Sequence, residues 1–336
     1  MIPLILLIIA TVGFIEGVLA GLLAALLLFV LNYSRTQVVR YALSGAQAKS
    51  TVERDLDDER FLREQGAQLY LLTLRGYLFF GTATQLISRV RHRAQDPNMA
   101  PLRFVLIDFD EVTGIDSSAT YAFNRMALMA RQQGFVILLT GLAPGLQHRL
   151  HVRQGPEDPD HVRSFVDRDR GLEWYENQLL EKQGGGRSRV TKSILQHIAD
   201  RFRDPAKVRA LVSRLSEISF PQGHELIRQG EEAGDLYLLE EGEVSVYLRS
   251  SDGDTIRIRR TGAGTVLGEL GFYLGKPRSA SVVADCPGKV YRLTAAALET
   301  MEAEQPDVAA ALHRFIAGLL AERLLQASQT LSAVMD

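Results

Sequence analysis

Hydrophobic and polar positions divide the chain into an apolar start and a longer part of mixed pattern. Residues 1–32 contain a single ionisable side chain, Glu16, and an apolar run of this length is typical of a segment that spans a membrane. A carboxylate is costly inside a bilayer unless it faces a polar cavity or a partner. Because Glu16 interrupts the run, we expect either one kinked spanning helix or two short helices, Ile2–Ile15 and Val18–Leu31.

The pattern between residues 41 and 182 alternates between apolar runs and helical periodicity. Asp116 is placed to cap a helix, and Gly134 is placed to end it. Strands that alternate with helices favour a mostly parallel sheet covered by helices. The predicted strands are Gln68–Leu74, Arg103–Phe109 and Phe135–Leu139, and the predicted helices are Thr82–Ala94 and Ser117–Gln133.

Glycines and short apolar runs shape the pattern of the last part of the chain. Ile194–Leu215 is helical with a break near Asp204. Glycines then separate short β-type runs such as Leu236–Leu239 and Val244–Leu248, which predicts a small antiparallel roll. Pro306–Met335 follows with apolar residues every three or four positions, so we expect a long amphipathic helix.

Composition excludes several classes of function. The 336 residues carry a formal net charge of −2 and one cysteine, which indicates two or three domains, no internal disulfide and no basic face for nucleic acid. We find no serine elbow, P-loop or paired carboxylates, and therefore expect no enzyme. His148, His151 and His161 have no further ligand to complete a metal site, so we expect no metal.

Residues 268–282 carry the most specific chemistry, in the run GELGFYLGKPRSASV. This run resembles the phosphate-binding cassette of cyclic nucleotide-binding domains. The resemblance implies that Arg278 binds both free phosphate oxygens with its planar guanidinium and that Glu269 binds the ribose 2′-hydroxyl. A short helix after Leu270 would direct its free N–H groups at the phosphate. The resemblance further assigns the ligand-binding residues Gly268, Glu269, Leu270, Arg278, Ser279 and Ala280.

The base of the implied nucleotide depends on Ser279, which follows the arginine directly. Its hydroxyl can bind the phosphate, and it could also reach the amino group of a guanine. Cyclic AMP is the preferred ligand, with cyclic GMP as the alternative. A roll that kept the fold and lost the ligand would be expected to lack the arginine or the glutamate, and both residues are present here.

Three runs in the first half carry a second resemblance. Residues 106–119 read LIDFDEVTGIDSSA, which is similar to the core motif of STAS domains, the domains of sulphate transporters and anti-sigma-factor antagonists. Residues 74–83 (LRGYLFFGTA) and 165–180 (FVDRDRGLEWYENQLL) resemble the STAS domains of SulP-family anion transporters in particular. The apolar start resembles the last membrane helices of that family, so the resemblance covers residues 1–182.

Ser117 has two interpretations. In the soluble antagonists the first serine of the Asp-Ser-Ser motif is a phosphorylation site, and a phosphate at a helix N-terminus would meet free N–H groups. Asp116 and Ser117 can instead act only as capping residues. Ala119 stands where the antagonists usually have glycine, which favours the capping role.

The combined expectation is a multidomain chain. It comprises a transmembrane helical segment (1–32), an α/β STAS domain (33–183), a glycine-rich linker (184–192) and an all-β, jelly-roll-like cyclic nucleotide-binding domain with flanking helices (193–336). Arg35 and Arg40 follow the apolar start, so the positive-inside rule places both later domains in the cytoplasm, at the inner membrane.

The implied function is that of the regulatory part of a SulP-type transporter of sulphate-like anions, to which a cyclic nucleotide binds. The dozen or so membrane helices of such a transporter are missing from this chain, so we expect no transport by the chain alone. Its partners would be the transporter core and a second copy of the chain. The alternative is a membrane-anchored STAS scaffold that binds a protein partner, with a roll that is structural or senses a nucleotide for another output.

Overall fold

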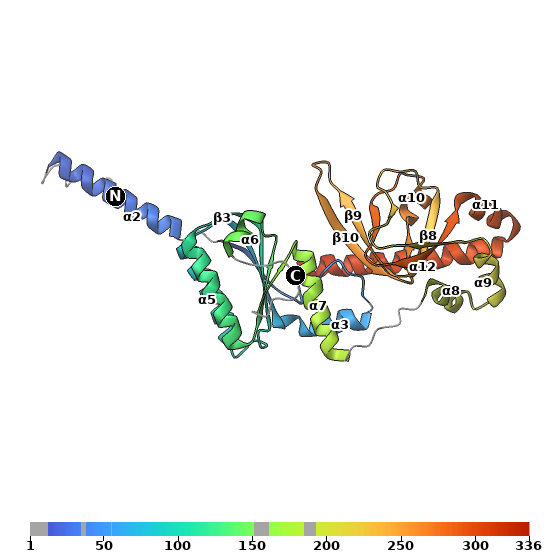
Figure 1. The fold of residues 1–336 in the computed structure, drawn as a ribbon, viewed down its shortest axis with the longest axis horizontal. Helices are drawn as coiled ribbons and strands as arrows, with labels where there is room; N and C mark the ends of the chain where they lie inside the picture. The colour runs from blue at the N-terminus through green and yellow to red at the C-terminus, as the bar shows by residue number, and fades with distance from the viewer. Residues whose placement is uncertain (1–12, 35–37, 55, 151–160, 185–192, 336) are drawn as a thin grey trace. The chain divides into compact units, whose positions relative to one another are not determined.

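The computed structural model describes residues 13–34, 38–54, 56–150, 161–184 and 193–335, which fall into two compact units (Figure 1). The first unit consists of Met1–Ala48 and Arg63–Tyr175, and the second of Lys49–Leu62 and Glu176–Asp336. Lys49–Leu62, which we expected within the STAS domain, therefore groups with the second unit. Of the linker expected at 184–192, only Gly184 lies among the described residues.

A helix, α2 (Phe14–Ser34), leads into the first unit. It begins after Gly13, whose φ is +148°, and runs through Glu16 and Gly17 without the break that we expected there. One glycine costs a helix only about 1 kcal/mol relative to alanine, so the helix can continue. Within the described ranges, no helix is long and apolar enough to cross a membrane. The described residues therefore do not bear out the spanning segment expected over 1–32, of which 1–12 lie outside them.

A five-stranded sheet in the order β1-β2-β3-β4-β5 forms the centre of the first unit. β1 pairs antiparallel with β2, and the remaining neighbours pair in parallel, which confirms the mostly parallel sheet. The strands are β1 (Val39–Ser44), β2 (Leu69–Leu78), β3 (Phe104–Ile115), β4 (Val136–Thr140) and β5 (Val162–Phe165).

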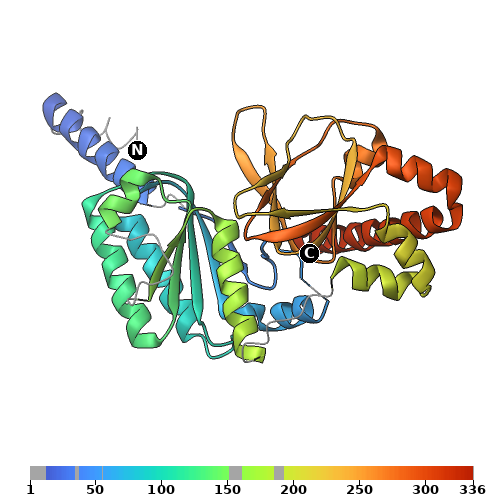
Figure 2. The same cartoon turned by 45° about the vertical axis from the view of Figure 1, so that its right-hand side comes forward.

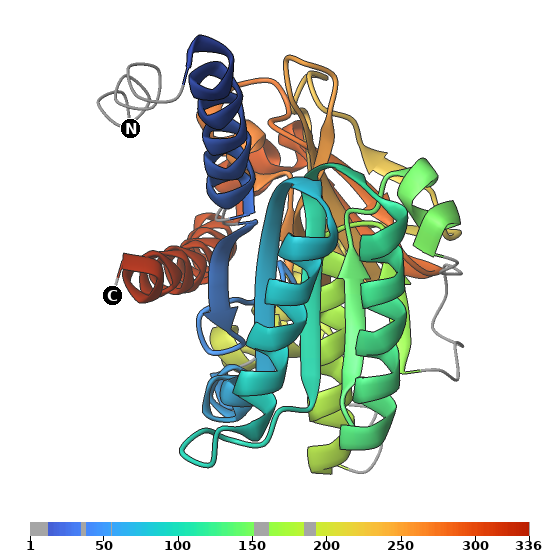
Figure 3. The same ribbon diagram turned by 90° about the vertical axis from the view of Figure 1, so that its left-hand side faces the viewer.

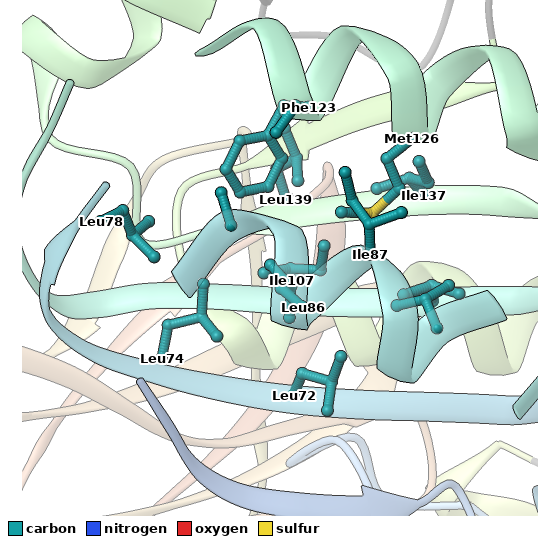
Figure 4. Close-up of a cluster of buried hydrophobic side chains, with 14 of the residues drawn as sticks. Leu72, Leu74, Leu78, Leu86, Ile87, Ile107, Phe123, Met126, Ile137 and Leu139 are labelled. Carbon is teal, nitrogen blue, oxygen red and sulfur yellow. The ribbon is translucent and has the colours of Figure 1, made fainter. Parts of the chain in front are cut away.

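Helices cover both faces of this sheet. α4 (Phe80–Gln95) and α5 (Ser117–Gln133) lie side by side over one face (Figure 3), and their Leu86, Ile87 and Phe123 pack on buried strand residues such as Ile107 (Figure 4). The first half of α7 (Arg168–Gly184) covers the other face (Figure 2), where the Phe104 ring meets Trp174 and Tyr175 edge-on. The shorter helical elements are α3 (Leu56–Gln65), η1 (Gly66–Gln68) and α6 (Pro144–Leu150).

The second unit contains a roll of two four-stranded antiparallel sheets, which confirms the predicted all-β domain. One sheet has the order β10-β9-β12-β7 and the other β11-β8-β13-β6. Leu239, Val244 and Val282 are buried between the strands. The strands are β6 (Ser216–Phe220), β7 (Glu225–Ile227), β8 (Asp235–Glu241), β9 (Glu243–Arg249), β10 (Thr255–Gly262), β11 (Val266–Leu267), β12 (Ser281–Ala284) and β13 (Gly288–Thr294).

Helices before and after the roll share a second core with it. The predicted break near Asp204 is confirmed, because this residue caps a new helix by accepting a hydrogen bond from the Ala206 amide at 2.9 Å. Leu312 and Phe315 of the long last helix pack in one buried cluster with Leu236 and Leu238 of the roll. The helices are α8 (Ile194–Phe202), α9 (Pro205–Val212), α10 (Glu269–Leu274), α11 (Ala295–Glu304) and α12 (Pro306–Met335).

The core of the first unit can be tested with Ile107→Ala. Ile107 is fully buried, so the substitution should lower the free energy of unfolding by about 2–5 kcal/mol through lost burial and a residual cavity. Trp174 is the only tryptophan and packs on this unit's sheet, so its fluorescence during urea unfolding reports this unit. Leu128→Ala, at an exposed position of α5, is the control and should change the transition little.

Candidate functional site

The six cassette residues predicted from the sequence line one cavity of about 220 Å³ in the roll. The cassette begins at the end of β11, continues through α10 and returns into β12. α10 begins at Glu269 and not after Leu270, because Gly268 takes the capping position with a left-handed φ of +81°. The lining residues are Ile227, Val246, Ile258, Arg259, Gly268, Glu269, Leu270, Gly271, Arg278, Ser279, Ala280 and Val282.

Arg278 is a buried cation of the cavity wall, which also contains Arg259. Its side chain is buried, with the residue 7% exposed, and its guanidinium donates to the Gly268 carbonyl at 2.8 Å and to the Asp235 carbonyl at 2.6 Å. A Cβ at position 268 would lie 2.3 Å from Arg278 Nη1, so only glycine fits against the guanidinium. The two carbonyls use part of the donor set of an arginine, and the remaining N–H groups can serve an anion in the cavity.

Glu269 supplies the carboxylate of the cavity, and in this structure an arginine of α12 binds it. The residue is 6% exposed, and its Oε1 accepts a hydrogen bond from Arg323 Nη1 at 2.8 Å. Arg323 also donates to the Thr265 hydroxyl and, at 3.1 Å, to the Val266 carbonyl. The group that we assigned to a ribose hydroxyl is therefore already paired with a cation of the same chain.

Arg323 lies between two carboxylates. Its Nη1 faces Glu269, and its Nε lies 3.5 Å from Glu53 Oε1, which is also 3.4 Å from Nη1 of Arg259 in the cavity wall. Burial lowers the pKa of the Arg323 guanidinium, and the charge of Arg259 lowers it further, whereas Glu53 and Glu269 raise it. The two carboxylates thus compensate two neighbouring arginines that would otherwise repel each other.

Sequence reasoning did not identify Arg323, Arg259 or Glu53. The helical pattern of Pro306–Met335 predicted a long amphipathic helix, but it did not single out Arg323 beside Leu324. Glu53 stands in a charged stretch with no periodicity. Only the fold brings these residues to the cavity, because they lie far apart along the chain.

The remaining cassette positions form the open side of the cavity. Ser279 and Leu270 are exposed, whereas Ala280 is buried at the start of β12. Beyond the cavity, the Tyr273 hydroxyl lies 2.9 Å from His313 Nδ1, and His313 Nε2 lies 3.0 Å from Glu302. Burial, and then the charge of Glu302, raises the pKa of Tyr273 to about 12, so the hydroxyl stays neutral near pH 7. This chain of contacts connects α10 to α12 and α11.

In the first unit, Ser117 is the exposed first residue of α5, and Asp116 is its cap. Asp116 Oδ1 accepts a hydrogen bond from the Ala119 amide at 2.6 Å, so the cap predicted for this residue is confirmed. Ala119 is fully buried. The capping role belongs to Asp116, and phosphorylation of Ser117 stays a prediction.

A buried carboxyl, Asp108, lies one strand residue before Phe109 in the same motif. The Thr140 hydroxyl donates to it at 3.0 Å. Burial raises its pKa, and the hydrogen bond from Thr140 opposes that shift. This hydrogen bond joins β3 to β4, so we assign Asp108 a structural role in the sheet. Among the described residues no group of three or more histidine, cysteine or acidic side chains could hold a metal, and His151 lies outside them.

The assignment of the cap can be tested with Asp116→Ala. Loss of the hydrogen bond to the Ala119 amide should lower the free energy of unfolding by about 1 kcal/mol, measured by urea unfolding with Trp174 fluorescence. Ser117→Ala should have almost no effect, because Ser117 is exposed and inside the helix. Equal losses for both variants would show that Ser117 shares the capping role.

Two parts of the chain match family models. Residues 62–154 match the STAS domain, and residues 217–305 match the cyclic nucleotide-binding domain. The second match contains the whole cassette, including Glu269 and Arg278. The first contains the sheet strands β2 to β4 with α4 and α5.

Several curated proteins are similar to this chain. Glutaminase 2 of Bradyrhizobium diazoefficiens is 28% identical over 86% of this chain and 44% of its own length. The vacuolar basic amino acid transporter VSB1 of Saccharomyces cerevisiae is 27% identical over 50% of this chain and 17% of its own. The CRP-like cAMP-activated global transcriptional regulator of Mycobacterium tuberculosis is 27% identical over 38% of this chain and 56% of its own length. The chain thus spans less than half the length of the first two relatives.

Solved structures similar to this chain include a cyclic nucleotide-binding domain from Methylobacillus flagellatus and the catabolite activator protein of Thermus thermophilus. The first is 28% identical with a TM-score of 0.38 and covers 40% of this chain and 79% of that one. The second is 27% identical with a TM-score of 0.36 and covers 41% and 63%. The family matches, together with the sheet and the roll, show that the chain carries a STAS domain followed by a cyclic nucleotide-binding domain.

Proposed function

We propose that the roll binds a cyclic nucleotide, cyclic AMP in preference to cyclic GMP, and that the chain is a regulatory part and not an enzyme. One observation carries this proposal: a buried arginine and a buried glutamate, Arg278 and Glu269, line the same cavity. A cyclic phosphodiester has one negative charge and offers a hydroxyl on its ribose. The two side chains match those two groups, since a guanidinium binds phosphate oxygens and a carboxylate accepts from a hydroxyl.

Burial strengthens the match. Because Arg278 is buried, a charge-assisted hydrogen bond from it to a phosphate oxygen is worth more than one in solution. The carbonyls of Gly268 and Asp235 hold the guanidinium in place before a ligand arrives, so little rotamer freedom is lost on binding. Ile258 and Leu270 offer apolar surface at the cavity for the flat face of a base.

Two features of the cavity support a movement on binding. Pockets for small ligands usually measure about 300–1,000 Å³, and this cavity measures about 220 Å³. Arg323 of α12 also holds the carboxylate that the ribose would need. We therefore propose that a nucleotide displaces Arg323 from Glu269 and shifts α12. A ligand changes the balance of two such states only by binding one of them better, typically with a coupling of about 1–3 kcal/mol.

The recipient of this signal is, in our proposal, the membrane part of a SulP-type transporter of sulphate-like anions. The apolar residues 1–32 and the LRGYLFFGTA run at 74–83 support it. The likeness to a vacuolar basic amino acid transporter supports a transporter as the recipient and does not bear on the anion. The STAS and nucleotide-binding domains would then lie in the cytoplasm at the inner membrane. We further propose that the chain acts as a homodimer, which the exposed Leu324 and Leu325 of α12 would favour.

A second candidate function is that the same two domains regulate a catalytic domain or a protein partner instead of a transporter. The likeness to glutaminase 2 extends over 86% of this chain, so it includes both domains, and that relative has an enzyme's name. In this alternative the STAS domain acts as a scaffold that binds a catalytic domain or a protein partner. Sulphate transport that responds to cyclic nucleotide would favour the first candidate, and capture of a soluble catalytic partner by the STAS domain would favour the second.

Calorimetric titration of the chain with cyclic AMP and cyclic GMP tests the ligand. We expect micromolar binding that Arg278→Ala weakens by roughly 10- to 100-fold, the effect of losing a hydrogen bond to a charged group. Arg278→Lys keeps the positive charge but lacks the planar guanidinium, so it should also bind the nucleotide weakly. It provides the test if the alanine variant folds poorly. Circular dichroism checks the fold of each variant.

The matched control for this titration is Arg228→Ala. Arg228 is an exposed arginine of the same unit, where it pairs with Glu225 and does not line the cavity. The Arg228→Ala variant should bind the nucleotide with the affinity of the unmodified chain. Micromolar binding that survives both substitutions at Arg278 would contradict the proposed site, and absence of binding by the unmodified chain would contradict the proposed function.

Sulphate uptake by membrane vesicles tests the output. In vesicles that contain this chain together with the membrane part of a SulP-type transporter, we expect cyclic AMP to change the rate of uptake. At cyclic AMP concentrations that just saturate the unmodified chain, Arg278→Lys should respond little, because the phosphate loses its bidentate partner. Vesicles with this chain alone should show no uptake, since a transport pathway needs the helices of the membrane part. A response that persists in Arg278→Lys would show that the nucleotide acts elsewhere.

A further inference from the structure

The segment Lys49–Arg54, called the docking segment below, adds itself to the edge of the nucleotide-binding roll. The Arg260 amide donates to the Thr51 carbonyl at 3.0 Å, and the Glu53 amide donates to the Arg260 carbonyl at 2.8 Å. Val52 thereby forms a parallel bridge with Arg260 of β10, the outermost strand of its sheet. A short extended segment that pairs with an edge strand gains main-chain hydrogen bonds and register without a large interface.

The flanks of the docking segment are held by Glu176 of α7. The Ser50 amide and hydroxyl donate to the two oxygens of the Glu176 carboxylate at 2.7 and 2.6 Å, and Arg54 Nε donates to it at 2.9 Å. Ser50 and Glu176 are buried. The centre of the segment contacts the roll through the two backbone hydrogen bonds and the carboxylate of Glu53.

Glu53 connects the docking segment to the ligand cavity. Its carboxylate lies 3.4 Å from Arg259 Nη1 and 3.5 Å from Arg323 Nε, and Arg259 lines the cavity. Arg323 is the same residue that binds Glu269. A ligand that takes Glu269 and attracts Arg259 would therefore draw both cations away from Glu53 and leave its carboxylate without these partners.

We propose that Glu53 makes the docking segment a competitor of the nucleotide, docked on β10 when the cavity is empty and released when the ligand displaces Arg323. This inference rests on the proposed binding of a cyclic nucleotide. The docking segment lies in the chain between β1, which ends at Ser44, and α3, which begins at Leu56. Its release would thus be passed covalently to the strand and helix on either side of it. Because the coupling is reciprocal, a docked segment weakens nucleotide binding by the same factor by which nucleotide weakens docking.

Hydrogen exchange of the chain with and without cyclic AMP tests the release. Peptides covering 49–54 should be protected in the absence of nucleotide, and saturating cyclic AMP should make them exchange roughly tenfold faster or more. Peptides from β4 are the internal control and should not change. Nucleotide that binds without altering exchange at 49–54 would overturn the release while leaving the proposed function intact.

Glu53→Gln tests the role of the carboxylate. Without its charge the docking segment should exchange faster before any ligand is added, and cyclic AMP should bind roughly two- to fivefold more tightly, as expected for loss of a partly exposed ion pair. Glu243→Gln is the matched control, because Glu243 pairs with Arg260 on the neighbouring strand and makes the same change of net charge. It should leave the affinity for cyclic AMP unchanged. Equal gains of affinity in both variants would overturn the competition in favour of general repulsion.

Arg323→Gln separates this inference from the proposed function. It removes the shared cation without any ligand, so exchange at 49–54 should rise in the free chain. If the chain bound no cyclic nucleotide, the proposed function would fail. Exchange in the free Glu53→Gln and Arg323→Gln variants would still show whether these two residues hold the docking segment. Unchanged exchange at 49–54 in both variants would overturn that link.

Discussion

The contact on which the nucleotide-binding unit depends is the buried guanidinium of Arg278 against the carbonyls of Gly268 and Asp235. It joins the end of the cassette to Gly268, the residue that caps α10 just before Glu269, and to Asp235 at the start of β8. The close approach of Nη1 to Gly268 requires a residue without a side chain and with a left-handed φ. A buried charge of this kind is costly unless it is hydrogen-bonded, and here backbone oxygens hold it ready for an anion.

A second constraint follows from the first, because Arg259 and Arg323 place further positive charge beside the same cavity. Glu269 and Glu53 compensate this charge, one from the cassette and one from Lys49–Arg54, which lies between β1 and α3 in the chain. In our proposal an anionic ligand changes that balance, because it would bind the cations and compete with the carboxylates. The proposed ligand would thus act on two contacts of the empty cavity, that of Arg323 in α12 with Glu269 and that of Glu53 in Lys49–Arg54 with Arg259 and Arg323.

Much of the fold could be predicted from local pattern. The strands at 103–109 and 135–139, the cap at Asp116, the break near Asp204 and the antiparallel roll were all visible as period, glycine spacing or capping chemistry. The cassette was equally visible, because its residues are contiguous and each type matches one group of the ligand. The apolar start was less well predicted: Glu16 and Gly17 lie inside α2, since one polar residue and one glycine do not suffice to end a helix.

By itself, the sequence determined the two domain types and the six cassette residues, because the periodicity of an element and the chemistry of a short motif lie in neighbouring residues. Only the tertiary structure decided what neutralises the cassette. Arg323 and Glu53 lie more than fifty residues from Glu269, on either side of it in the chain, and no pattern connects them. Their pairing depends on the packing of α12 and of the segment Lys49–Arg54 against the roll. Contacts between residues so far apart in the chain leave no local pattern in the sequence.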